Sequence, residues 1–215
     1  MIIYAIMMKI EEKFMKKTIR FFRVINIILI LSIIAISVSI FSAGAYVTTG
    51  VKLNTDYVFS FVPHQSFTDL TIEHFRNSTN SWNDAADLTL MSVSGARHNE
   101  TGYPNNDNKH YVYKEVRSDL SVPGQTTCYN SAWPHGNVLK SADVLINSHF
   151  KFVNSQREDR FDTWSVFVHE AGHVAGLDHT NYTQDASIVM FPQAFMNFLR
   201  RYPQWDDING INAIY

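Results

Sequence analysis

The chain of 215 residues contains a single cysteine, Cys128. One cysteine can form no intramolecular disulfide and cannot build a cysteine-based zinc finger. We expect Cys128 to be a small, buried, apolar residue. Internal repeats, low-complexity tracts and a second linker are also missing after Tyr46. Residues 46–215 are therefore expected to form one compact domain.

A basic stripe is missing from the same part of the chain. Residues 1–45 hold six of the 18 Lys and Arg residues but only two of the 20 acidic residues, which leaves residues 46–215 with a formal net charge of −6. Nucleic-acid binding requires clustered Lys and Arg to neutralise phosphates. We therefore expect no nucleic-acid partner. All nine histidines lie in this acidic part, which hints at metal chemistry.

One long apolar run is present, and it lies near the N-terminus. Basic residues from Lys16 to Arg23 precede an uncharged stretch, Val24–Ser42, and the small residues Ala43–Ala45 follow. This order is typical of a secretory signal peptide with its cleavage site. The apolar run is also close to the ~20 residues that span a bilayer, so a retained signal anchor stays open.

Residues 1–45 are thus predicted to be a signal peptide or a signal anchor. The first 14 residues precede a more natural start at Met15 and can be an upstream extension. In both cases residues 46–215 are expected outside the cytoplasm, either secreted or held at the membrane by the N-terminal segment.

The pattern of residues 46–215 predicts an α+β layered domain, with strands early, one helix in the middle and one at the end. The longest predicted helix begins near Asp162 or Thr163 and stops at Gly176. Alternation and helical periodicity give the remaining elements. Strands are predicted at Tyr57–Val62, Leu88–Val93, His110–Val116 and Ala142–Ile146, and helices at Phe67–Trp82, Phe161–Leu177 and Pro203–Ile214.

Residues 169–179 read HEAGHVAGLDH. His169 and His173 share one helical face, at the separation that a tetrahedral zinc requires. Glu170 points to an adjacent face, where it can reach a zinc-bound water without binding the metal. Gly176 allows the helix to end and the chain to turn back. His179 can then supply a third ligand.

This motif is specific. At this composition, HExxH alone would occur by chance in about one such sequence per hundred, and the added glycine and third histidine lower that to on the order of one in 10⁵. A purely structural zinc site is disfavoured, because a closed four-ligand site does not need an adjacent free carboxylate such as Glu170.

HEAGHVAGLDH resembles the extended metzincin motif HExxHxxGxxH, and its Gly-Leu-Asp-His ending is most similar to the matrixin branch. Ser187–Pro192 resembles the methionine turn of that family, with Met190 as a packing floor rather than a ligand. Asp206–Tyr215 is similar to the closing matrixin helix. The resemblance implies a metzincin (zincin-like) catalytic domain, in which a twisted, mainly parallel β-sheet packs on the active-site helix and a C-terminal helix follows.

The chain departs from animal matrixins in several places. Only His149–Trp164 lies where they have a loop with structural zinc and calcium, so we expect one catalytic zinc and no calcium. Their cysteine-containing pro-segment is not expected either. Their Pro-x-Tyr pocket wall appears as Pro192-Gln193-Ala194, which favours a wider primed-side pocket. A matrixin-like enzyme is expected to cut before bulky apolar residues.

The sequence therefore predicts a monomeric zinc metalloendopeptidase that acts on protein or peptide substrates. His169, His173 and His179 would bind Zn²⁺ and leave a position for water, whose pKa falls toward ~7. Glu170 would act as general base and then as general acid. Two alternatives stay open: an inactive, zinc-stabilised extracellular binding module, and a zinc hydrolase of cell-wall peptides.

The other histidines are not expected to bind the metal. His135, beside Trp133, is expected in a loop, with a place in the substrate cleft as the alternative. The rest are expected at the surface or in local hydrogen bonds: His64, His74, His98, His110 and His149.

Overall fold

The computed structural model describes Met15 and residues 45–130, 137–182 and 184–215. It divides into two units, residues 1–44 and residues 45–215. The predicted signal segment, apart from Met15 and Ala45, lies outside the described residues, as do Trp133 and His135. Within the described ranges, no helix is long and apolar enough to cross a membrane.

A five-stranded sheet forms the framework of the second unit, with the strand order β3-β2-β4-β6-β5. Its first four strands pair in parallel, and β5 runs antiparallel to β6 at one edge. The prediction of a mainly parallel sheet is confirmed. The strands are β2 (Phe59–Pro63), β3 (Met91–Val93), β4 (Tyr111–Glu115), β5 (Gly124–Asn130) and β6 (Leu139–Asn147).

Two short strand pairs form separate two-stranded sheets. β1 (Val47–Thr48) pairs antiparallel with β9 (Leu177–Asp178), and β7 (Phe152–Val153) pairs in parallel with β8 (Phe161–Asp162). The first pair fixes the chain directly before His179. The start of the domain is thereby tied to the motif.

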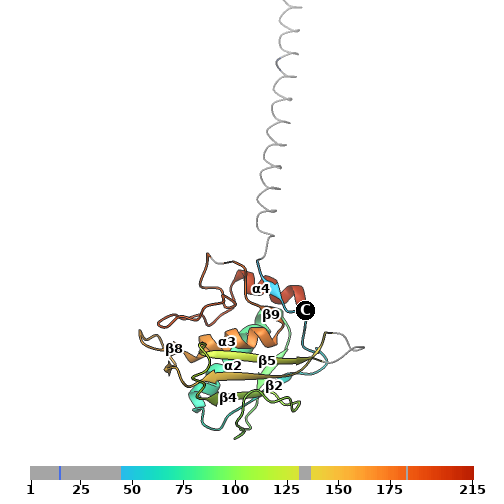
Figure 1. Ribbon diagram of the computed structural model, residues 1–215. Helices are drawn as coiled ribbons and strands as arrows, with labels where there is room; N and C mark the ends of the chain where they lie inside the picture. Colours follow the sequence, from blue (N-terminus) through green and yellow to red (C-terminus); the bar gives the residue numbers. More distant parts are fainter. Residues whose placement is uncertain (1–14, 16–44, 131–136, 183) are drawn as a thin grey trace, which may run out of the picture. The chain divides into compact units, whose positions relative to one another are not determined.

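Three helices complete the described domain: α2 (Asp69–Ala86), α3 (Thr163–Val174) and α4 (Trp205–Ile214). Figure 1 shows α3 running beside β5, with α4 beyond α3. Thr68 caps α2 by accepting a hydrogen bond from the Thr71 backbone N–H. Asp162 caps α3 in the same way, through the Ser165 N–H, where the sequence predicted the helix to begin.

The apolar core joins the sheet to α2 and α3. Phe167 of α3 lies edge-on to Phe61 of β2, with ring centroids 5.5 Å apart, and 4.2 Å from the Phe75 ring of α2. Trp82 of α2 is fully buried, and its Nε1 donates to the Val168 carbonyl over 2.8 Å. α3 is therefore held by packing and by a buried hydrogen bond.

The structure corrects several predictions from sequence. Strand β5 was not predicted at all. α2 continues to Ala86 rather than ending at Trp82, because Ala86 also packs in the core and overrides the weak helix propensity of the asparagines before it. Cys128 is exposed rather than buried, because it lies on the edge strand. His74 is buried against Trp164 rather than at the surface.

The Asp162 carboxylate caps α3 and also binds Arg201, at 2.6 Å and 3.0 Å, while it is almost fully buried. We expect Asp162→Ala to lower the free energy of unfolding by about 2–4 kcal/mol, because it removes the cap and leaves Arg201 without its partner. The exposed Asp159 is the matched control, and Asp159→Ala should cost less than about 1 kcal/mol. Urea unfolding measures both variants, and equal losses would contradict this assignment.

Candidate metal centre

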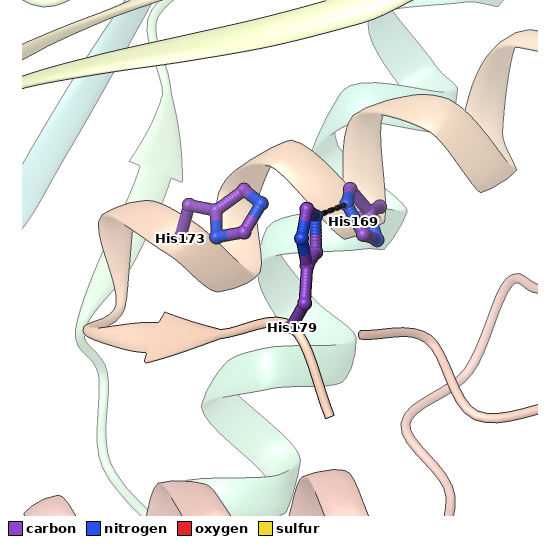
Figure 2. A group of neighbouring side chains, drawn as sticks. All are labelled: His169, His173 and His179. Atoms are coloured by element: carbon purple, nitrogen blue, oxygen red, sulfur yellow. Dashed lines mark hydrogen bonds between the residues drawn. The ribbon is translucent and has the colours of Figure 1, made fainter. Parts of the chain in front are cut away.

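The structure brings His169, His173 and His179 together, as Figure 2 shows. One helical turn separates the first two on α3, and their ring centroids are 4.9 Å apart. The His179 ring lies 5.1 Å and 4.9 Å from these two rings. One ligand nitrogen from each ring lies within 4.8 Å of the others. No other such group occurs among the described histidines, cysteines and acids.

Gly176 makes the return of His179 possible. Its φ of 101° is strained for any residue with a side chain, and an added Cβ would collide with the Val51 carbonyl oxygen. The helix therefore ends at Val174, and the chain enters β9 at once. This is the turn that the sequence predicted at Gly176.

Two backbone carbonyls set the orientation of the helical imidazoles. His169 Nδ1 lies 2.7 Å from the Val189 oxygen, and His173 Nδ1 lies 2.9 Å from the Leu177 oxygen. A carbonyl only accepts, so each Nδ1 carries a proton and each neutral ring keeps its lone pair on Nε2. Such outer contacts are typical of metal-binding histidines.

The ring nitrogens lie close enough together to share one metal ion. His169 Nε2 lies 3.2 Å from His179 Nε2, drawn as the dashed line in Figure 2. Two ring nitrogens at this distance need a proton or a cation between them. Three convergent imidazoles fit zinc, which takes three protein ligands in catalytic sites and keeps one position open.

The surroundings of His169 and His173 favour the neutral form of both imidazoles. Burial lowers the pKa of His169 well below its ordinary value, and the neighbouring His173 lowers it further. Burial also lowers the pKa of His173. Both rings are therefore unprotonated at neutral pH, the form that binds a metal.

Glu170 lies beside these rings and is only 5% exposed. Its Oε2 accepts a 2.7 Å hydrogen bond from Thr126 Oγ1, which also lies 3.1 Å from the Glu170 carbonyl. Burial raises the pKa of Glu170 to about 7, and the Thr126 hydrogen bond opposes that rise. A carboxyl group with such a pKa can exchange protons near neutral pH.

Met190 lies under α3 and is buried. A Cβ added at Gly172 would collide with the Met190 sulfur and come within 2.8 Å of the Trp82 ring. The glycine therefore lets the methionine and the tryptophan approach the helix between His169 and His173.

Asp207 fixes the methionine turn from α4. Its carboxylate accepts hydrogen bonds from the backbone N–H groups of Val189, Met190 and Gln204, over 2.8, 3.0 and 2.7 Å. The Val189 carbonyl in turn orients His169. Asp207 lies in the first turn of α4, where the helix dipole favours an acid, and its contacts also reach the metal centre.

Asp206 ties other segments to the same helix. Its carboxylate accepts from the backbone N–H groups of Ala45 and Tyr46, over 2.8 Å and 3.0 Å, and from Thr180 Oγ1 over 2.6 Å. Thr180 directly follows His179. The start of the domain and the third histidine are therefore both anchored at the N-terminus of α4.

A cavity of about 260 Å³ opens beside the three histidines. It lies between β5 and the segment that follows Met190, and its lining includes Gly124, Thr126, Val166, Phe195, Phe198 and Arg200. Pro192 and Ala194 also line it. The cavity has room for a substrate side chain next to the candidate metal site.

Two residues of this site were missed by sequence reasoning. Thr126 lies on β5. Threonine and tyrosine favour strands, so the stretch from Thr126 to Tyr129 was the signal from which this strand could have been predicted. Arg200 gave no signal, because nothing in its neighbourhood shows that its side chain turns inward.

Asp207→Asn should weaken zinc binding about ten- to hundredfold, because it removes the charge and one acceptor that hold the Val189 carbonyl against His169. Competition with a chromophoric chelator measures the affinity, and circular dichroism verifies the fold. Asp159→Asn, at an exposed acid, is the matched control and should bind zinc like the unaltered chain. A folded Asp207→Asn chain with unchanged zinc affinity would refute this role.

Comparisons with known proteins place the chain in a family. A family model described as Matrixin matches residues 54–215. Human matrix metalloproteinase-27 is 45% identical over 56 residues, which are 26% of this chain and 10% of that protein. Mouse matrix metalloproteinase-19 is 29% identical over 116 residues, which are 48% of this chain and 21% of that protein.

The chain thus matches only about a tenth to a fifth of the length of these curated relatives. Among solved structures, it is similar to high choriolytic enzyme 1, a hatching enzyme zinc-protease from the medaka fish Oryzias latipes. The TM-score is 0.41 and the identity 14%, over 77% of this chain and 94% of that one. Since the matrixin model covers most of the chain, the chain belongs to the matrixin family.

Proposed function

We propose that the chain is a zinc metalloendopeptidase, in which His169, His173 and His179 bind the metal and Glu170 transfers protons. The observation that carries this proposal is the convergence of three imidazole nitrogens beside the buried carboxylate of Glu170, which is not a member of that group. The adjoining cavity and the matrixin match support it. Met190 serves as the packing floor of the site.

When bound, zinc would polarise the scissile carbonyl as a Lewis acid and lower the pKa of a water in its open position. Glu170 accepts a proton from the attacking water and delivers it to the leaving amine. The Thr126 hydroxyl holds one oxygen of this carboxylate and leaves the other free for the proton. The pKa of about 7 suits a group that must both accept and release a proton at neutral pH.

The two alternative functions make different use of Glu170. A zinc-stabilised binding module has no need for a carboxylate whose charged form is destabilised by burial beside the metal ligands, whereas a hydrolase does. A hydrolase of cell-wall peptides would use the same chemistry on another substrate. Digestion of a protein such as casein separates both alternatives from a general endopeptidase.

We further propose that residues 46–215 are the catalytic domain and residues 1–45 a signal peptide or signal anchor. The compact unit at residues 45–215 and the basic residues before the apolar run support this division. The catalytic domain then acts outside the cytoplasm, secreted or membrane-anchored, as a monomer with protein or peptide substrates.

Glu170→Ala should keep one zinc per chain and reduce casein cleavage about a hundredfold or more, because the proton acceptor is lost while all three imidazoles stay. Metal analysis and the cleavage rate are measured on the same sample. Glu73→Ala, at an exposed glutamate of α2, is the control that should keep both. Full cleavage by the zinc-loaded Glu170→Ala chain would exclude the proposed role of Glu170.

A further inference from the structure

A buried positive charge lines the cavity beside the histidines. Arg200 is only 8% exposed, yet it lines the cavity. Three phenylalanine rings surround its guanidinium, with the Cζ atom 5.7 Å from the centroids of Phe191 and Phe195 and 5.8 Å from that of Phe198. An aromatic wall and a cationic group therefore share one pocket.

The guanidinium binds only carbonyl groups. Nη1 donates to the oxygens of Ile188 and Phe191, and Nη2 donates to the oxygen of Gln193. A guanidinium has five N–H donors, so two of them find no acceptor among the described residues. Burial lowers the pKa of Arg200 to about 10, and Asp207 opposes this shift without forming an ion pair with it. The group stays charged at neutral pH.

The acids that line the cavity are already occupied. Asp162 is paired with Arg201, at 2.6 Å and 3.0 Å. Glu170 accepts the Thr126 hydroxyl and faces the metal centre. Arg200 is therefore the cavity-lining charge that no carboxylate of the described residues neutralises.

We infer that this pocket selects an acidic substrate side chain, glutamate, at the residue that follows the scissile bond. The methylene groups would pack between the phenylalanine rings, and the carboxylate would pair with the two unused N–H donors of Arg200. This inference rests on the proposed function and names its substrate class. It departs from the bulky apolar residue that resemblance to matrixins implies.

Three peptides test the inference, identical except for glutamate, glutamine or leucine after the scissile bond. The zinc-loaded chain should cleave the glutamate peptide with a kcat/KM about tenfold or more above that of the glutamine peptide, and above that of the leucine peptide. Glutamine has nearly the same shape, so the ratio reports the charge.

Substitutions assign the preference to Arg200. Arg200→Met should bring the glutamate-to-glutamine ratio to about one, and Arg200→Lys should retain part of it. Each ratio is measured on one enzyme sample, so it does not depend on the fraction that is folded. Arg157→Met removes a charge from an exposed site outside the cavity and should leave the ratio unchanged.

Binding gives a second readout. The zinc-loaded Glu170→Ala chain should bind the glutamate peptide more tightly than the glutamine peptide in fluorescence anisotropy, and Arg200→Met in that background should abolish the difference. A ratio near one in the unaltered chain, or a ratio that survives Arg200→Met, overturns the inference and leaves the proposed function intact. If the zinc-loaded chain cleaves neither casein nor any of the three peptides, the proposed function is overturned and the inference with it.

Discussion

The fixed orientation of three imidazole rings is the constraint on which the rest of the site depends. α3 supplies two rings, and the turn at Gly176 returns the third. Val189 holds the His169 ring by its carbonyl, and Asp207 holds Val189 by its N–H group. A chain of hydrogen bonds thus runs from the last helix to the metal centre, so α4 contributes to the site as well as to the fold.

Buried charge recurs around this centre, and the backbone satisfies most of it. Asp206 and Asp207 are each 1% exposed, and backbone N–H groups are their main partners. Arg200 shows the opposite polarity, because its guanidinium donates to backbone carbonyl oxygens. Burying a charge is costly unless it is hydrogen-bonded. Moving the backbone groups that these side chains bind would expose that cost, so the hydrogen bonds hold those backbone segments in place. Arg200 differs from the two acids because part of its hydrogen-bonding capacity is left for a ligand.

Local signals predicted much of this arrangement. The cap at Asp162, the spacing of the histidines and Gly176 gave the bounds of α3 to within a few residues, because short-range chemistry decides them. β5 was missed because its polar residues become a strand only by pairing with β6, which follows later in the chain. The Thr126 contact with Glu170 was lost with it. Tertiary packing alone turns Arg200 inward, and the exposure of Cys128 depends on which strand forms the edge.

The most direct test of the account is the zinc content of the His179→Ala chain, compared with the unaltered chain and with His149→Ala at an exposed histidine. Each protein is loaded with zinc, dialysed against a weak chelator and analysed for metal by mass spectrometry. The account predicts one zinc per chain in the unaltered protein and in His149→Ala, and almost none in a folded His179→Ala chain. A full zinc equivalent retained by His179→Ala would contradict it.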